Sequence, residues 1–203
     1  LAQAEGREVP VLMRVAPGIK TQTHTFIQTG QLDSKFGLGL ATSAAREGVR
    51  LTLESPGLKL RGLHCHIGSQ LFGLDAFQKT AELMVEFMSQ IREECGVVLE
   101  ELDLGGGLGI SYTPEDTPPT IAELADIISS GLRATCEQFD YPLPRLILEP
   151  GRSIVGTAGT TLYRVGPVKE IPGVRTYVAV DGGLSDNPRP ALYDAEYTAI
   201  IAN

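Results

Sequence analysis

The sequence predicts an α/β fold, part of a (β/α)8 TIM barrel that runs into the start of a C-terminal β domain. Up to residue 149, apolar β-rich runs alternate with amphipathic helical stretches. This alternation is typical of β/α units around a parallel sheet. After residue 149, two β-rich runs follow with no long helical pattern between them. We therefore expect an incomplete barrel domain at residues 1–153 and the beginning of a β domain at residues 154–203.

The predicted strands are short runs dense in Val, Leu and Ile that stop at Gly, Pro or a polar residue. Such continuous apolar runs are typical of strands buried on both faces of a sheet. In the barrel part they are residues 9–15, 58–67, 98–104 and 145–148. In the second part they are residues 160–168 and 174–180.

The predicted helices are stretches in which apolar side chains recur every three or four residues. Two of them are clear, at residues 77–91 and 121–132, and a weaker one is expected at residues 41–50. Thr120 stands just before the second clear helix, with Glu123 three residues later. This spacing predicts a capping box, in which each side chain accepts a hydrogen bond from the other residue's backbone N–H.

Composition limits the classes of function. With 203 residues, 42% hydrophobic and 21% charged, the chain can bury a core. Its formal charge of −8 disfavours nucleic acid and anionic membranes as partners, and no run approaches the roughly 20 apolar residues of a membrane span. Three cysteines without paired spacing favour a reducing compartment, and we expect the cytoplasm. Because the chain opens at Leu1, we expect a central fragment.

In barrels of this type the chemistry lies where the strands end, so the residues at the carboxyl ends of the predicted strands are the candidate sites. The first is His64-Cys65-His66-Ile67-Gly68-Ser69. Strand alternation puts His64 and His66 on one face, with His66 nearer the mouth, where its flat ring could stack on a planar ligand. A pair of structural histidines is an equally good interpretation of this segment taken alone.

The second candidate is the glycine-rich run Gly105-Gly106-Gly107-Leu108-Gly109, which follows Asp103. Glycines expose the backbone, so that consecutive N–H groups can surround an anion such as phosphate. The spacing matches neither the nucleotide P-loop nor a complete Gly-x-Gly-x-x-Gly, because Ile110 stands where the last glycine would be. A tight structural turn remains an open alternative.

The third candidate is Glu149-Pro150-Gly151-Arg152, again at the end of a strand. Arg152 offers a forked cation suited to phosphate or carboxylate, and Glu149 could hold a ligand's ring nitrogen protonated. An internal ion pair between the two is the alternative. The fourth candidate is Arg189 and Tyr193, four residues apart in Arg-Pro-Ala-Leu-Tyr, which suits recognition of a substrate carboxylate, with a surface salt bridge as its alternative.

Together these segments suit one ligand with an aromatic ring, a basic ring nitrogen and a phosphate, which is pyridoxal 5'-phosphate. The chain resembles the fold-type III decarboxylases that use this cofactor on an alanine racemase-like barrel, and most closely the diaminopimelate decarboxylase family. The resemblance covers nearly the whole chain and rests on these motifs, in family order: Asp33-Ser34-Lys35-Phe36-Gly37, His64-Cys65-His66-Ile67-Gly68-Ser69, Asp103-Leu104-Gly105-Gly106-Gly107, Glu149-Pro150-Gly151-Arg152 and Arg189-Pro190-Ala191-Leu192-Tyr193-Asp194.

The resemblance also implies roles for individual residues. His66 would stack on the cofactor ring, and Glu149 would pair with its ring nitrogen; these are the expected catalytic residues. The cofactor's remaining contacts would come from Ser69, Gly105, Gly106, Gly107, Pro150, Gly151 and Arg152. Arg152, Arg189 and Tyr193 would bind the substrate. Arg14 matches an arginine near the cofactor, and residues 33–37 are expected to be structural.

The activity implied by the resemblance is decarboxylation of meso-diaminopimelate to lysine, in lysine biosynthesis, by a homodimer with shared active sites and no metal. The Schiff-base lysine is expected upstream of this chain, because no lysine present ends a predicted strand, so the isolated 203-residue piece should be inactive. An ornithine- or arginine-type decarboxylase and a non-catalytic relative of the same fold remain alternatives. A metal-dependent hydrolase is disfavoured, because only His24 remains as a third histidine.

Overall fold

The computed structural model describes residues 1–19 and 35–202 of the chain. The sequence positions Lys20, His24, Asp33 and Ser34 lie outside the described residues. The chain divides into two compact units, one formed by Leu1–Ile110 and Thr117–Ile154 and the other by Ser111–Asp116 and Val155–Asn203. Each unit is described by itself.

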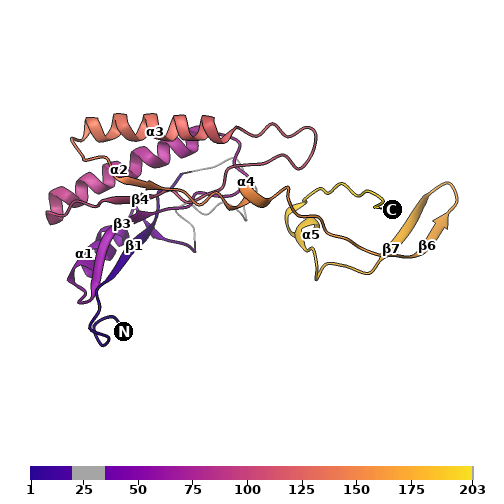
Figure 1. Cartoon of the computed structure of the whole chain (residues 1–203), viewed down its shortest axis with the longest axis horizontal. Coiled ribbons are helices and arrows are strands. Elements are labelled where there is room, and N and C mark those ends of the chain that lie inside the picture. The colour runs from indigo at the N-terminus through magenta and orange to yellow at the C-terminus, as the bar shows by residue number, and fades with distance from the viewer. Residues whose placement is uncertain (20–34, 203) are drawn as a thin grey trace. The chain divides into compact units, whose positions relative to one another are not determined.

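The first unit contains a parallel sheet with one helix in each connection from β2 to β5 (Figure 1). Its five strands pair in the order β2-β1-β3-β4-β5, and every pairing is parallel. The strands are β1 (Val9–Ala16), β2 (Leu38–Gly39), β3 (Leu58–His64), β4 (Glu101–Asp103) and β5 (Arg145–Ile147). The helices are α1 (Ala44–Glu54), α2 (Asp75–Cys95), α3 (Ile121–Gln138) and α4 (Gly151–Val155). The predicted alternation of strands and helices is confirmed.

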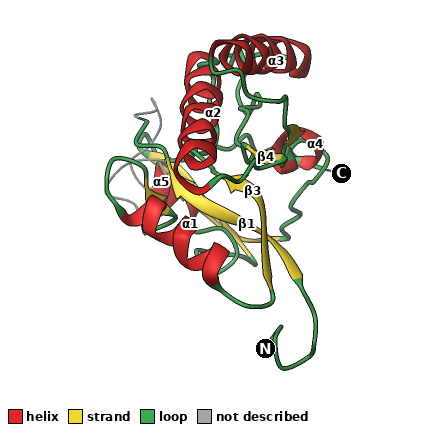
Figure 2. Ribbon diagram, turned by 90° about the vertical axis from the view of Figure 1, so that its left-hand side faces the viewer, coloured by secondary structure: helices red, strands yellow, loops and turns green. Residues whose placement is uncertain are grey.

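The core of this unit lies between the sheet and its helices. Figures 1 and 2 both show α2 and α3 side by side. Met84 and Met88 on α2 share the hydrophobic core with Leu63 of β3 and Leu102 of β4, and all four side chains are fully buried. Burying a side chain of this size contributes about 1.5–3 kcal/mol. The apolar face of α2, spaced every three or four residues, therefore holds the helix against the strands.

The predicted capping box at the start of α3 is confirmed. The N–H of Glu123 donates to Thr120 Oγ1 at 3.1 Å, and the N–H of Thr120 donates to Glu123 Oε2 at 2.7 Å. Helix α1 begins later than expected, at Ala44 instead of residue 41, and its N-cap Ser43 makes no side-chain capping bond.

Two predicted strands of the first unit are longer than the real ones by three or more residues, and in the second unit the run predicted at 160–168 forms its strand at Val165–Ile171. The run predicted to continue to residue 67 ends as a strand at His64, so His66 lies on the loop that follows. Likewise, the run predicted at 98–104 forms a strand only over Glu101–Asp103. Beyond His64 the chain turns, and Gln70 takes a left-handed φ of 58° that no strand contains. Apolar residues that follow these strands are buried in loops and make no strand pairing. Their composition is the same as that of strand residues, so composition alone does not locate the strand ends.

The second unit contains an antiparallel hairpin of β6 (Val165–Ile171) and β7 (Arg175–Val180), followed by the short helix α5 (Arg189–Tyr193). The β-rich character expected after residue 149 is present in this hairpin. Among the helices that the structure describes, none is both long enough and apolar enough to span a membrane.

Candidate active site

The carboxyl ends of the parallel strands bring the candidate residues of the first unit into one region. In the sheet register Arg14 of β1 is paired with His64 of β3, and His64 is paired with Asp103 of β4. Paired residues of a parallel sheet point to the same face, so these three side chains form a row across neighbouring strands. The segments that follow β3, β4 and β5 carry the other predicted site residues of the first unit, next to this row in the chain.

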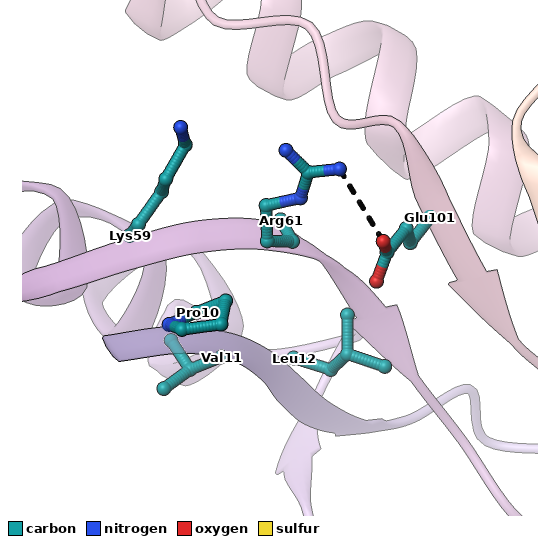
Figure 3. A pocket seen from close by; sticks show the side chains of 6 residues that line it. All are labelled: Pro10, Val11, Leu12, Lys59, Arg61 and Glu101. Atoms are coloured by element: carbon teal, nitrogen blue, oxygen red, sulfur yellow. Dashed lines mark hydrogen bonds and ion pairs between the residues drawn. The ribbon is translucent and has the colours of Figure 1, made fainter. Parts of the chain in front are cut away.

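A cavity of about 490 Å³ lies elsewhere (Figure 3). It is lined by Pro10, Val11, Leu12, Lys59, Arg61 and Glu101, which lie early in β1 and β3 and at the start of β4. Arg61 Nη2 and Glu101 Oε1 pair across it at 3.4 Å. Because ligands of β/α barrels bind at the carboxyl ends of the strands, we do not assign this cavity to the site.

His66 is held against the glycine-rich loop. Its Nδ1 accepts a hydrogen bond from the N–H of Gly106 at 3.2 Å, so the ring proton resides on Nε2. Burial lowers the pKa of His66, and the positive charge of Arg14 lowers this pKa further. The ring is therefore neutral near pH 7, which suits stacking against a flat ligand.

The glycine-rich run packs tightly against its neighbours. A Cβ on Gly106 would lie 2.1 Å from the carbonyl oxygen of Glu149, and one on Gly107 would lie 2.1 Å from that of Gly68. Gly105 and Gly107 also have left-handed φ angles of 68° and 111°. The structural interpretation of these glycines therefore holds: they let three strand ends meet.

The same geometry narrows how this loop can bind an anion. The N–H of Gly105 donates to Asp103 Oδ1 at 2.8 Å, and the N–H of Gly106 donates to His66. Both groups are thus satisfied by protein atoms. A phosphate at this loop must therefore use other N–H groups or displace these two bonds.

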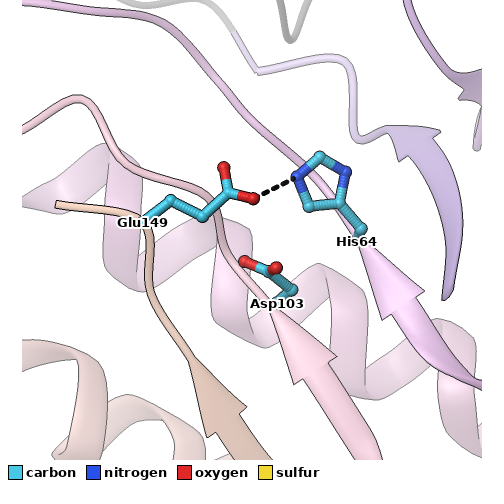
Figure 4. Close-up of side chains that lie close together, drawn as sticks. All are labelled: His64, Asp103 and Glu149. Atoms are coloured by element: carbon cyan, nitrogen blue, oxygen red, sulfur yellow. Dashed lines mark ion pairs between the residues drawn. The ribbon is translucent and has the colours of Figure 1, made fainter. Parts of the chain in front are cut away.

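Glu149 lies beside His64 and Asp103 (Figure 4). Its Oε1 is 3.7 Å from Nε2 of His64, and one ligand atom from each of the three residues lies within 4.8 Å of the others. Burial raises the pKa of Asp103; the hydrogen bond from Gly105 opposes this rise, and the charge of Glu149 adds to it. The sequence analysis included His64 and Asp103 in candidate motifs, but it assigned neither of them a role at the cofactor.

Arg152 and Ser69 form the second polar group of the site. Arg152 Nη2 donates to Ser69 Oγ at 3.0 Å, joining the segment after β5 to the loop after β3. The expected alternative, an ion pair between Arg152 and Glu149, is not among the contacts of the described residues. Gly151 begins α4, and a Cβ there would meet no atom within 4 Å, so the space beside it is open.

Gln70 is a contributor that the sequence did not reveal. Its side-chain amide donates to the carbonyl of Ile110 at 2.6 Å and accepts from the N–H of Ile110 at 3.2 Å. Next to it, the backbone of Leu71 bonds to Gly107 and Gly109, both at 2.9 Å. These four bonds hold the loop carrying Ser69 to the glycine-rich loop.

Two other predicted positions have local partners. The guanidinium of Arg14 lies 4.7 Å from the ring centre of Phe36, and that of Arg189 lies 5.4 Å from the ring centre of Tyr193. Arg189 and Tyr193 are thus neighbours on α5, in the second unit. The roles assigned to these residues stay predictions.

Comparison with known proteins identifies the family of the first unit. The sequence profile of the family "Pyridoxal-dependent decarboxylase, pyridoxal binding domain" matches residues 1–156. A diaminopimelate decarboxylase of Bacillus subtilis is 44% identical over 203 residues, covering 100% of this chain and 46% of the relative. One from Synechocystis is 43% identical over 203 residues, again with 100% of this chain and 43% of the relative covered. The chain thus spans about half the length of these curated relatives.

Solved structures give the same result. A diaminopimelate decarboxylase of M. jannaschii in complex with L-lysine superposes with a TM-score of 0.84 at 38% identity, covering 97% of this chain and 44% of that one. A lysine/ornithine decarboxylase of Vibrio vulnificus has a TM-score of 0.69 at 22% identity over 94% of this chain and 46% of that one, which shows a shared fold alone. The predicted fold class, an α/β chain forming part of a cofactor-binding barrel, is confirmed. Because the profile of the pyridoxal-binding domain matches more than half of its residues, the chain belongs to the pyridoxal-dependent decarboxylases.

Proposed function

We propose that the protein carrying this chain decarboxylates meso-diaminopimelate to lysine with pyridoxal 5'-phosphate. The observation that supports this most directly is the meeting of His66, Glu149 and the Arg152–Ser69 pair at neighbouring strand ends. The naming of the relatives at 43–44% identity as diaminopimelate decarboxylases favours this substrate over ornithine or arginine.

The residues present fit the cofactor chemically. A phosphate dianion needs a cation and hydroxyl or N–H donors, which Arg152 and Ser69 provide. A protonated ring nitrogen needs a carboxylate, and the Glu149 side chain is 54% exposed, within reach of a ligand. A planar ring needs a flat apolar partner, which the neutral imidazole of His66 supplies. The three requirements are met by loops after β3 and β5.

The bound cofactor would supply a conjugated ring that takes up the electrons left when carbon dioxide departs. Glu149 would keep the ring nitrogen protonated, so that the positive charge needed for this uptake persists. Arg152 and Ser69 would fix the phosphate end and thereby orient the ring, while His66 would cover one face and exclude water. Arg189 and Tyr193 would bind the distal carboxylate of the substrate.

The remaining features of the proposal concern the rest of the protein. In residues 1–19 and 35–202, no lysine ends a strand of the first unit: Lys59 lies early in β3 and Lys79 lies in α2. We place the Schiff-base lysine outside this chain. We also propose that the complete protein is a homodimer and that it works in the cytoplasm. We also place the boundary between the barrel and the β domain at residues 153 and 154.

The test is to incubate the complete protein with pyridoxal phosphate and measure carbon dioxide release from meso-diaminopimelate, ornithine and arginine. Release from diaminopimelate alone is expected, and preferential release from ornithine or arginine would refute the substrate assignment. Borohydride reduction should attach the cofactor to a lysine of the complete protein but to none in the 203-residue chain. An adduct and steady carbon dioxide release from the chain alone would refute the placement of the lysine.

A matched pair of variants tests the substrate contact. Arg189 and Arg175 each lie over a tyrosine ring in the second unit, Arg175 at 5.8 Å from the ring centre of Tyr177. Arg189→Gln should raise KM for diaminopimelate by about tenfold or more, because a charge-assisted bond contributes about 1.5–3 kcal/mol. Arg175→Gln should leave KM unchanged. Equal effects from both variants would show that Arg189 has no specific role.

A further inference from the structure

The main chain of Glu149 is fixed, whereas its carboxylate depends on a side chain from another strand. The N–H of Glu149 donates to the carbonyl of Gly105 at 2.9 Å, and its own carbonyl packs against Gly106. The side chain, in contrast, is 54% exposed. An exposed glutamate normally samples several rotamers, so something must restrain this one if it is to face a ligand atom.

His64 is the restraining group that the structure offers. Within residues 1–19 and 35–202, it is the only ion-pair partner of Glu149 when its ring is protonated, with Nε2 3.7 Å from Oε1. The His64 side chain is only 17% exposed, and its backbone belongs to the β3 ladder, where it is in register with Arg14 and Asp103. The His64 side chain is therefore anchored at the end of β3, and Figure 4 shows its ring directed toward the Glu149 carboxylate.

Asp103 creates the need for this restraint. It is buried, its Oδ1 accepts the N–H of Gly105, and its carboxylate lies within the same 4.8 Å cluster as that of Glu149. Two carboxylates so close repel each other. Burial is the main cause of the raised pKa of Asp103; the charge of Glu149 also raises this pKa, and that of His64 lowers it. A protonated His64 between the two carboxylates thus offsets part of this repulsion.

We propose that His64 is a positioning residue: its Nε2 holds Oε1 of Glu149 against the repulsion of Asp103 and so aims that carboxylate at the ring nitrogen of the bound cofactor. The inference rests on the proposed function in one respect, the role of Glu149 opposite the ring nitrogen. It goes beyond that function by giving His64, which contacts neither phosphate nor substrate in the proposal, control over the electronic state of the ring.

The test compares variants of the complete, cofactor-loaded protein. His64→Leu removes the Nε2 nitrogen at similar side-chain size, and His64→Gln restores an amide nitrogen near the same position. The Leu variant should lower kcat for diaminopimelate by about 10- to 100-fold, the cost of a misplaced group, with KM little changed. It should also shift the absorption band of the bound cofactor toward that of Glu149→Gln. The Gln variant should recover most of kcat and the wild-type band.

Two further readouts separate positioning from a merely structural role. Adding His64→Leu to Glu149→Gln should cause no additional loss of kcat, because His64 acts only through Glu149. Cofactor content and the unfolding midpoint should be the same in the Leu and Gln variants. If the Leu variant does not fold, His64→Asn replaces it, since its amide nitrogen is too close to the backbone to reach Glu149.

The outcomes are distinct. Wild-type kcat and absorption in His64→Leu or His64→Asn, with Glu149→Gln slow, overturn the positioning role and leave the proposed function intact. The positioning role is also overturned if adding His64→Leu to Glu149→Gln lowers kcat by the same factor as His64→Leu does alone. Wild-type kcat in Glu149→Gln overturns the role of Glu149 itself, and the positioning role of His64 with it.

Discussion

Replacement of Gly106 by alanine tests whether the close packing of strand ends builds the site. Gly106 has no left-handed φ, so the added methyl group acts by contact alone. Its Cβ would lie 2.1 Å from the carbonyl oxygen of Glu149, and the contact must open by about 1.3 Å to reach 3.4 Å, an ordinary distance. The neighbour is backbone, so no side-chain rotation can relieve the clash.

Opening that contact has a cost that can be worked out. Overpacking of this kind destabilises by about 1–3 kcal/mol. The hydrogen bond from the N–H of Glu149 to the carbonyl of Gly105 is in the path of the movement, and its loss adds about 1 kcal/mol. We expect Gly106→Ala to lower the free energy of unfolding by about 2–4 kcal/mol. It should also weaken the binding of pyridoxal phosphate, because Glu149 and Arg152 move with the displaced backbone.

The assay is urea unfolding followed by circular dichroism, together with cofactor titration by absorbance. Gly73→Ala is the matched control: Gly73 lies on the loop before α2, has no left-handed φ, and its Cβ would meet no atom within 4 Å. The control should differ from wild type by less than about 0.5 kcal/mol. Wild-type stability and cofactor affinity in Gly106→Ala would refute the claim that these strand ends touch.

Three more predictions concern single interactions. Thr120→Ala removes a complete capping box and should lower the free energy of unfolding by about 1 kcal/mol in the same urea assay. Ser43→Ala, at an N-cap without a side-chain hydrogen bond, should lower it by less. Equal losses in the two variants would contradict this prediction. Gln70→Ala removes both hydrogen bonds to Ile110 and should lower the free energy of unfolding by about 1–3 kcal/mol. An unchanged urea midpoint would show that these two hydrogen bonds do not stabilise the protein. Because burial raises the pKa of Asp103 above 3.8, its contribution to stability is present below about pH 4 and lost as pH rises through the raised pKa. Asp103→Asn should therefore gain stability relative to wild type as the pH rises above about 4, and a difference that does not change with pH would contradict the raised pKa.

Local interactions made much of the fold predictable. The capping box at Thr120 needs only side chains three residues apart, and the apolar spacing of α2 follows from its own helical period. The central residues of the strands were also predictable from local sequence, because dense runs of Val, Leu and Ile are typical of buried strands in a parallel sheet. The strand ends were not, because buried loop residues such as Cys65 and Ile67 have the same composition as the strand before them.

The sequence by itself determined the chemistry that is available: a carboxylate, an arginine, histidines and a glycine run, each following a predicted strand. Only the tertiary structure decided their partners. It paired His64 with Glu149, engaged two of the loop N–H groups with Asp103 and His66, and gave Gln70 its hold on Ile110. Apart from the bond between Gly105 and Asp103, which is local, these contacts join residues 40 or more positions apart. Their geometry depends on strand register and backbone turns that no local pattern encodes.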